Sequence, residues 1–211
     1  MRYYPIGLDI SGRRCLVIGG GEVGERKAQR LLECGARVSV VGRELTPALA
    51  GLAQGGRIDH IPGDYDKGLL KGAFLVIGAT DDRVVNERIF LDARKRGVLA
   101  NIVDDPERCD FIVPAVARRG PILVTISSQG ASPALARRLR ERVEAEIGPE
   151  YGELANLLGR LRPEVMAVGN EDTRQRIWEA ILDSQVLALL CDGRKEEAER
   201  EARRCISSAQ G

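Results

Sequence analysis

Three glycines, Gly19, Gly21 and Gly24, carry the clearest chemical signal in the sequence. They lie in the run GGGEVG and fit the pattern G-x-G-x-x-G, directly after an apolar strand-like run and at the start of an amphipathic stretch. There the first glycine permits a tight turn, the second lets the backbone approach a pyrophosphate, and the third allows close helix packing. Glu22 and Val23 complete the turn at a helix N-terminus, which attracts phosphate. The run predicts a dinucleotide site; a glycine-rich turn without a ligand is the alternative.

Two charged residues after the second strand-like run bear on which dinucleotide binds. In such sites an acidic residue at the end of this strand holds the adenine ribose hydroxyls of NAD. Here Val41 is followed by Gly42, Arg43 and Glu44. A Glu44 carboxylate bound to the ribose hydroxyls favours NAD, and an Arg43 guanidinium bound to a 2′-phosphate favours NADP. If Arg43 is only a solvated surface charge, it does not distinguish the two cofactors. We expect NAD as the cofactor, and the sequence leaves NADP open.

Acidic residues also follow the fourth and fifth strand-like runs. Because ligands of α/β sheets bind at the carboxyl ends of strands, Thr80 and Asp81 are expected beside the nicotinamide. Capping of the next helix by Asp81 or Asp82 is the structural alternative. Asp104 is the candidate catalytic residue, since a carboxylate there can take a proton while hydride leaves to the cofactor. Asp104-Asp105-Pro is also ordinary turn sequence, and Asp105 leaves the assignment between two carboxylates open.

A serine-rich loop forms a second candidate site. Ser127, Ser128 and Gly130 precede Ser132, where a helix is expected to begin, and such N–H and hydroxyl groups suit an anion. A capping loop is the alternative and accounts fully for Ser132. Arg137 belongs to the densest basic cluster and suits a carboxylate ligand. The arginines alternate with glutamates, so a solvated helix face is the alternative for most of them.

The elements that must position these residues alternate between strands and helices. The expected strands are Arg14–Ile18, Arg37–Val41, Ile58–Pro62, Phe74–Ala79 and Leu99–Val103. The expected helices are Val23–Cys34, Thr46–Gln54, Lys67–Lys71 and Asp82–Arg96. Four of the five strand-like runs are nearly continuous in apolar residues, as in strands covered on both faces. This alternation predicts an α/β fold with a Rossmann-type, doubly wound parallel sheet.

The pattern changes after Pro106. Phe111–Ala117 and Ile122–Ser128 predict an antiparallel pair, followed by a helix that starts at Ser132-Pro133 and stops at Gly148-Pro149. Everything from residue 150 onward reads as helix, including one over Thr173–Cys191. We therefore expect a dinucleotide-binding domain over residues 1–113, a central dimerisation region over 114–149 and a helical domain over 150–211.

Composition narrows the function classes. Among 211 residues the formal net charge is +1, which argues against a general nucleic-acid binder. No apolar run approaches the roughly 20 residues of a membrane span, and residues 1–11 lack a secretion signal, so a cytoplasmic protein without membrane partners is expected. The five cysteines are scattered and form no CxxC pair, and His60 is the one histidine. We expect no protein-bound metal.

Several motifs in fixed order resemble the precorrin-2 dehydrogenase/sirohydrochlorin ferrochelatase family, which includes the N-terminal module of sirohaem synthases. They are Tyr4-Pro5-Ile6, VIGGGEVGERKA over Val17–Ala28, Ala79-Thr80-Asp81-Asp82, Val85-Asn86, Asn101-Ile102-Val103-Asp104, Phe111-Ile112-Val113-Pro114-Ala115 and SSQGASP over Ser127–Pro133. The motifs cover residues 1 to about 147, whereas the helical tail matches in character only.

The resemblance implies a homodimer that oxidises precorrin-2 to sirohydrochlorin with NAD, on the route to sirohaem or cobalamin. It implies that Asp104 is the key aspartate and that Ser127, Ser128, Gly130 and Arg137 meet the tetrapyrrole. In some members the same site also inserts Fe²⁺ into the product, and Co²⁺ is a further candidate metal here. The sequence has no histidine cluster, so it supports metal insertion less than it supports the dehydrogenase.

Two other hypotheses compete with this one. A dinucleotide-sensing regulatory subunit without catalysis needs neither Asp104 nor the serine loop. A dehydrogenase of small 2-hydroxy or amino acids usually presents a histidine or lysine at the nicotinamide, and the strand ends here offer carboxylates instead.

Overall fold

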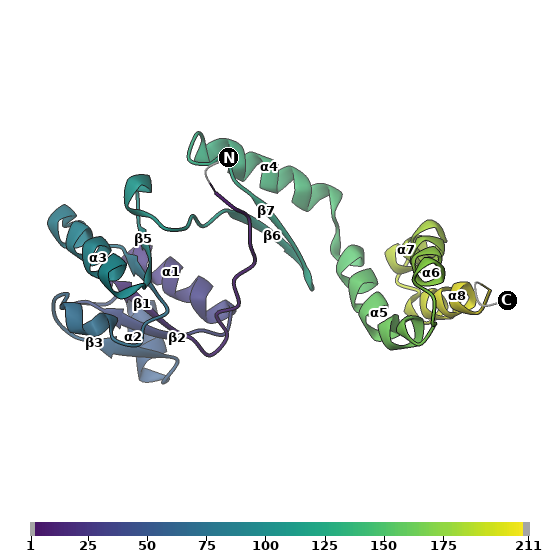
Figure 1. The fold of residues 1–211 in the computed structure, drawn as a ribbon, viewed down its shortest axis with the longest axis horizontal. Helices are drawn as coiled ribbons and strands as arrows, with labels where there is room; N and C mark the ends of the chain where they lie inside the picture. Colours follow the sequence, from purple (N-terminus) through teal and green to yellow (C-terminus); the bar gives the residue numbers. More distant parts are fainter. Residues whose placement is uncertain (1–2, 209–211) are drawn as a thin grey trace. The chain divides into compact units, whose positions relative to one another are not determined.

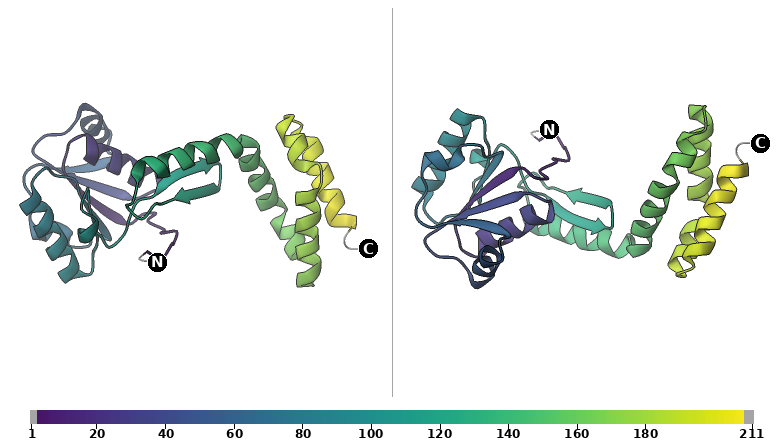
Figure 2. Two further views of the ribbon diagram at one scale, coloured as in Figure 1. Left: turned by 90° about the horizontal axis from the view of Figure 1, so that it is seen from above. Right: turned by 90° about the horizontal axis from the view of Figure 1, so that it is seen from below.

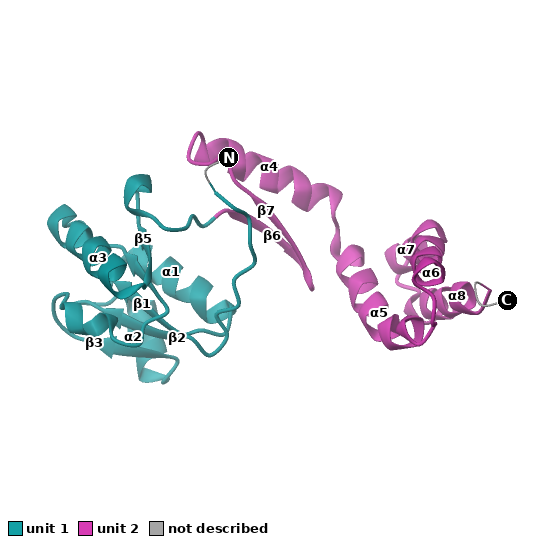
Figure 3. Cartoon of the chain, viewed as in Figure 1, with its two compact units in different colours: residues 1–113 teal, residues 114–211 magenta. Residues whose placement is uncertain are grey.

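The chain divides into two compact units, and the computed structural model describes residues 3–208. The first unit ends at Val113 and the second begins at Pro114 (Figure 3). Each unit has a hydrophobic core of its own. The division of the second unit into separate domains over 114–149 and 150–211 stays a prediction.

The first unit is built on one five-stranded parallel sheet. Its strands are β1 (Arg14–Ile18), β2 (Arg37–Val41), β3 (Ile58–Ile61), β4 (Leu75–Gly78) and β5 (Leu99–Ile102), in the order β3-β2-β1-β4-β5 (Figure 1). Its helices are α1 (Glu22–Glu33), α2 (Pro47–Gln54) and α3 (Arg83–Arg96), with short 3₁₀ turns η1 (Lys67–Leu70) and η2 (Pro106–Arg108). The strand order reverses at β1, which puts a ligand-binding switch point between β1 and β4.

Alternate side chains of β1 enter two different cores. Cys15 and Val17 pack in one cluster with residues of α1 and α2, whereas Leu16 and Ile18 pack in another with residues of α3. Successive side chains of a strand point to opposite faces, so helices cover both faces of this sheet. The predicted doubly wound Rossmann-type fold is confirmed.

Two predicted elements before α4 differ from the structure in type or in where they begin. The run Lys67–Lys71 forms the 3₁₀ turn η1, which Asp66 caps by accepting a bond from the Gly68 N–H (2.7 Å). The predicted antiparallel pair exists as β6 (Ala115–Arg119) and β7 (Ile122–Ile126), but β6 starts four residues later than Phe111. Phe111 instead packs on the core of the first unit, and its carbonyl accepts a bond from the Asn101 amide.

The second unit joins the β6–β7 pair to helices. Helix α4 (Pro133–Glu146) lies along the two-stranded ribbon (Figure 2), and Ser132 caps its N-terminus as predicted, accepting from the Leu135 N–H at 3.2 Å. Arg119 on β6 donates to the carbonyls of Glu144 (2.7 Å) and Ile147 (2.8 Å) and so binds the C-terminal end of α4. The ribbon and α4 therefore form one packed piece.

Four further helices form a bundle with its own core. They are α5 (Pro149–Met166), α6 (Glu171–Asp183), α7 (Val186–Cys191) and α8 (Lys195–Ser208). The prediction of one helix over Thr173–Cys191 is wrong, because the helix is interrupted between the end of α6 at Asp183 and the start of α7 at Val186. Ser184 accounts for the break: its hydroxyl donates to the Ile181 carbonyl (2.7 Å) and accepts from the Val186 N–H (3.3 Å). Over residues 3–208, no helix combines the length and apolar character that crossing a bilayer requires.

Candidate active site

The first and third glycines of the GGGEVG run pack the β1–α1 turn against its surroundings. Gly19 has a φ of +124°, and a Cβ atom there would overlap the backbone of Ala79 at the end of β4. A Cβ atom on Gly24 would overlap the carbonyl of Gly19. Both positions therefore require glycine for close packing of helix α1 and strand β4 on the turn.

The middle glycines have contrasting surroundings. Gly20 packs on the segment after β2, where a Cβ atom would overlap the carbonyl of Glu44. Gly21 has nothing within 4 Å of its Cβ position, so its side lies open. An open glycine backbone in front of a helix is what the approach of a pyrophosphate needs. The residues present thus fit a dinucleotide, and sequence reasoning overlooked the packing role of Gly20.

Helix α1 begins at the open side of the turn. Gly21 is its N-cap residue, and no side chain caps the helix there. Helix α2, by contrast, is capped by the Thr46 hydroxyl and α3 by the Asp82 carboxylate. The first N–H groups of α1, which include those of Glu22 and Val23, are therefore available to an anion.

At the end of β2, Arg43 is held by a partner that the sequence did not reveal. Its guanidinium donates two bonds to Asp64, with Nε–Oδ1 at 2.8 Å and Nη2–Oδ2 at 2.6 Å. The neighbouring Glu44 is exposed, and its carboxylate has no hydrogen bond or ion pair among residues 3–208. Of the two charges considered for the adenine ribose, the glutamate is the available one.

At the end of β4 the two aspartates have different surroundings. Asp82 caps α3 by accepting from the N–H groups of Val84 (2.8 Å) and Val85 (3.2 Å). Asp81 is exposed, and its carboxylate has no hydrogen-bond partner in the described part of the chain. The Thr80 hydroxyl donates to the buried Asn86 side chain at 2.9 Å, and Asn86 donates back to the Thr80 carbonyl. Thr80 is thus fixed in place, whereas the Asp81 carboxylate is unpaired within residues 3–208.

The two aspartates after β5, Asp104 and Asp105, also have different surroundings. Asp105 accepts a bond from the Arg108 guanidinium at 2.7 Å and caps η2, and Arg108 also pairs with Glu87 at 3.0 Å. Asp104 is exposed, and its carboxylate makes no hydrogen bond or ion pair within residues 3–208. Its backbone φ is +60°, in the left-handed region that residues other than glycine, asparagine and aspartate rarely adopt. Asp104 is therefore the carboxylate free for chemistry.

Cys109 binds the backbone around Asp104, a role that sequence reasoning missed. Its thiol lies 3.2 Å from the carbonyl oxygen of Ile102 and 3.1 Å from that of Asp105. It also accepts from the Ile102 N–H (3.3 Å) and from the Asn101 amide (3.4 Å). Burial raises the pKa of the Cys109 thiol, so the sulfur keeps its proton and remains a donor.

Lys27 is a second residue that the sequence analysis missed. It is half-buried on α1, three residues after Gly24, and burial lowers the pKa of its ammonium. The repulsion of Arg26 acts in the same direction, whereas the charge of Asp104 raises that pKa. The i, i+3 spacing from Gly24 was the available signal, because it puts a lysine near the packed face of the helix.

The candidate substrate residues belong to the second unit. Ser127 accepts from the Gln129 N–H at 3.0 Å and Ser128 from the Ser132 N–H at 2.9 Å, with Gly130 at a φ of +90°. These bonds shape the loop and leave the serine hydroxyl protons to other acceptors. Arg137 is exposed and donates to Glu141 at 3.0 Å. Their approach to Asp104 stays a prediction.

Comparisons with known families cover almost the whole chain. A family model described as putative NAD(P)-binding matches residues 6–115. Models described as the sirohaem biosynthesis protein central region and the sirohaem synthase dimerisation region match residues 119–146 and 150–206. The three matches follow one another along the chain without overlap.

Individual relatives agree with the family models. The siroheme synthase of Chromobacterium violaceum is 41% identical over 99% of this chain and 44% of its own length. Siroheme synthase 1 of Serratia proteamaculans is 42% identical over 95% of this chain and 42% of its own length. The chain thus spans less than half the length of these relatives.

A solved structure extends the likeness to the fold. SirC, a precorrin-2 dehydrogenase, superposes with a TM-score of 0.79 at 24% identity, over 96% of this chain and 100% of its own. At that identity the likeness establishes the fold. The family model over residues 6–115 shows that the chain belongs to the putative NAD(P)-binding family, with siroheme synthases among its relatives, in agreement with the resemblance noted in its sequence.

Proposed function

We propose that the protein is a dehydrogenase that oxidises precorrin-2 to sirohydrochlorin with NAD. The observation that carries the proposal is the carboxylate of Asp104, exposed, without a hydrogen-bond partner among residues 3–208 and in a left-handed conformation at the end of β5. Strained residues that the surrounding structure maintains are concentrated at active sites. The names of the relatives support the substrate, since they include siroheme synthases and a precorrin-2 dehydrogenase.

The residues at the glycine turn fit a nicotinamide dinucleotide. The open backbone at Gly21 and the uncapped start of α1 would hold the pyrophosphate, and Glu44 the adenine ribose. Thr80 and Asp81, at the end of β4, would line the nicotinamide side. Bound NAD⁺ supplies the hydride acceptor and takes up the electron pair that the substrate loses.

Asp104 acts as the proton acceptor in this proposal. One C–H bond of precorrin-2 breaks with loss of hydride, and a proton leaves the macrocycle to the Asp104 carboxylate as the new double bond forms. The charge of Asp104 raises the pKa of the Lys27 ammonium, so these two side chains interact electrostatically. Asp105 is engaged with Arg108 and does not take part.

The second unit supplies the substrate contacts and the assembly in this proposal. Precorrin-2 is a polycarboxylate, so the N–H and hydroxyl groups of Ser127, Ser128 and Gly130 and the guanidinium of Arg137 suit its side chains. We propose a homodimer, supported by the match of residues 150–206 to a dimerisation region. The five cysteines are free thiols, which supports a reducing compartment such as the cytoplasm.

Metal insertion is the less supported half of the family's chemistry. No group of three or more histidine, cysteine, aspartate or glutamate side chains with the arrangement of a metal site occurs among residues 3–208. Insertion of Fe²⁺ or Co²⁺ would therefore rely on Asp104 and on the nitrogens of the macrocycle itself. The dehydrogenase is the function that the geometry supports best.

An anaerobic assay with precorrin-2 tests the proposal. We expect NADH and sirohydrochlorin to form together when NAD⁺ is added to the full chain, and the Asp104→Asn variant to lose this activity while Asp105→Asn keeps it. Addition of Fe²⁺ or Co²⁺ to the product then tests chelation separately. Absence of a cofactor-dependent spectral change would refute the dehydrogenase and favour a regulatory dinucleotide sensor. Full activity of Asp104→Asn would refute the role of Asp104 as proton acceptor.

A further inference from the structure

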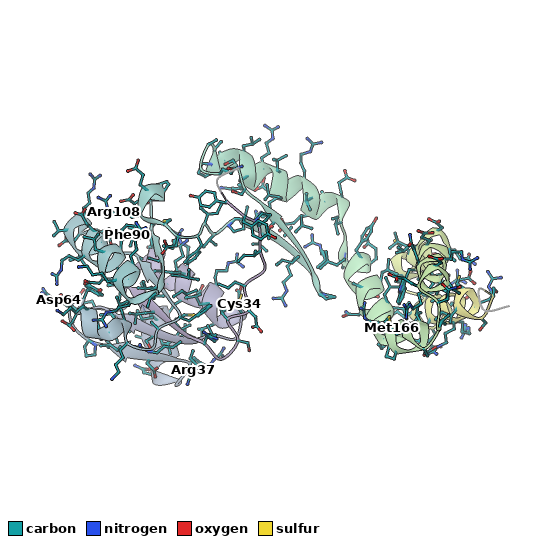
Figure 4. The ribbon with its side chains drawn as sticks, viewed as in Figure 1. Cys34, Arg37, Asp64, Phe90, Arg108 and Met166 are labelled. Carbon is teal, nitrogen blue, oxygen red and sulfur yellow. The ribbon has the colours of Figure 1, made fainter. Side chains whose placement is uncertain are left out.

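The ion pair between Arg43 and Asp64 lies where a dinucleotide's adenine ribose is expected. Arg43 follows β2 by two residues, and Asp64 follows β3 by three. Both side chains are largely exposed, at 76% and 71%, and they share two parallel bonds of 2.8 and 2.6 Å. Asp64 lies at the periphery of the first unit (Figure 4).

Backbone contacts hold the two ends of this pair close together. The Gly42 N–H donates to the carbonyl of Ile61 at 3.2 Å, which continues the pairing of β2 with β3. The His60 ring nitrogen Nε2 lies 2.9 Å from the Gly42 carbonyl oxygen and binds the peptide that leads into Arg43. The segment with Arg43 and the end of β3 that leads to Asp64 are thus tied together before any ligand arrives.

An arginine at this position would ordinarily favour NADP. The guanidinium fork binds phosphate and carboxylate in the same bidentate way, so a 2′-phosphate and Asp64 compete for the same N–H groups. A dinucleotide without that phosphate requires only an acceptor for its ribose hydroxyls, which the Glu44 carboxylate provides. Asp64 therefore affects one cofactor and not the other.

We propose that Asp64 is a specificity-determining residue, which occupies the donors of Arg43 and excludes a dinucleotide that carries a 2′-phosphate. The inference rests on the proposed dinucleotide site. Exclusion has two sources, competition for the guanidinium and repulsion between the Asp64 carboxylate and the phosphate. The hydrogen bonds from Arg43 lower the pKa of Asp64, so the carboxylate stays charged at neutral pH.

An exposed ion pair contributes little to stability, so its removal leaves the fold intact. The test is isothermal titration of the full chain with NAD⁺ and with NADP⁺. We expect the parent to bind NAD⁺ more tightly than NADP⁺. In Asp64→Asn, which removes the charge at constant size, we expect NADP⁺ to bind about tenfold more tightly and NAD⁺ to change by less than about twofold.

Two further variants test whether the tighter NADP⁺ binding of Asp64→Asn comes from the freed guanidinium of Arg43. The double variant Arg43→Ala/Asp64→Asn should lose the tighter NADP⁺ binding, because the phosphate then has no guanidinium to meet. Glu197→Gln is a matched control, since Arg194 and Glu197 form an equally short bidentate pair, at 2.8 and 2.6 Å, on the second unit. It should leave the affinity for both dinucleotides at the parent values.

The outcomes separate this inference from the proposed function. Equal binding of the two dinucleotides by the parent, or no gain for NADP⁺ in Asp64→Asn, overturns the role of Asp64 and leaves the dehydrogenase standing as long as NAD⁺ binds. A gain that persists in the double variant also overturns it. Failure of the parent to bind either dinucleotide overturns the dinucleotide site itself, and both proposals with it.

Discussion

The thiol sulfur of Cys109 lies 3.2 Å from the carbonyl oxygen of Ile102, the last residue of β5. The same sulfur lies 3.1 Å from the carbonyl oxygen of Asp105. Asp104 lies between these two anchored residues and has the left-handed backbone conformation. A strained residue persists only where its surroundings over-determine it, so Cys109 acts as a positioning residue for the Asp104 carboxylate.

The first prediction concerns this positioning role. Cys109→Val fills similar space but removes the sulfur that accepts from the N–H of Ile102, and it removes one of the two acceptors of the Asn101 amide. We expect kcat for precorrin-2 oxidation to fall about tenfold, with the NAD⁺ dissociation constant unchanged, since the glycine turn is untouched. Cys109→Ser, which can still donate and accept, should recover part of kcat. A valine variant with the parent's kcat would contradict the role.

Asp104→Gly should separate stability from activity. Glycine adopts a φ of +60° without the strain of a side chain, so we expect the free energy of unfolding to rise by about 1 kcal/mol. Oxidation of precorrin-2 should fall by about 100-fold or more, because the proton acceptor is gone. Urea denaturation and the anaerobic assay measure the two effects. A less stable glycine variant would show that the Asp104 side chain supports the fold.

Three glycines of the turn, Gly19, Gly21 and Gly24, should respond differently to alanine. At Gly19 and Gly24 the new Cβ atom meets backbone, so we expect both variants to be destabilised by about 2 kcal/mol or more. At Gly21 the space is open, and Gly21→Ala should unfold like the parent yet bind NAD⁺ more weakly. Thermal denaturation and calorimetric titration distinguish the two classes. Normal NAD⁺ affinity in Gly21→Ala would argue against pyrophosphate contact at this position.

The lowered pKa of Lys27 predicts that the free energy of unfolding depends on pH. Burial lowers its pKa, so the folded state disfavours the charged lysine, and this penalty is present below the folded pKa. Between the folded pKa and the unfolded value the unfolded chain binds more protons, so stability from this group rises with pH. We therefore expect Lys27→Met to be at least as stable as the parent near neutral pH, with an advantage that shrinks towards about pH 10.

The rate of precorrin-2 oxidation and a control variant extend the test of Lys27. Lys27→Met should also slow precorrin-2 oxidation, since the positive charge that acts on Asp104 is lost. Lys67 is exposed at the start of η1, so Lys67→Met serves as the control and should change neither property. Urea denaturation at several pH values gives the comparison. A Lys27→Met protein that is less stable near neutral pH and fully active would refute the argument.

Local signals were enough for the architecture and for the type of ligand. Apolar runs of strand length alternate with amphipathic stretches, and this alone required crossover connections and a parallel sheet. The glycine pattern after the first run and Ser132-Pro133 at the start of α4 are signals of neighbouring residues, and the structure agrees with both. The single long helix over 173–191 was wrong because the Ser184 hydroxyl competes with the helical bonds.

Only the tertiary structure decided which charged side chains are free. The sequence presents Asp81 beside Asp82 and Asp104 beside Asp105 as equals, and contacts with α3, Arg108 and Cys109 distinguish them. Arg43 meets Asp64 across 21 positions of the chain, through the pairing of β2 with β3. Such partners are set by how strands and helices pack, and packing joins residues that no short sequence pattern contains.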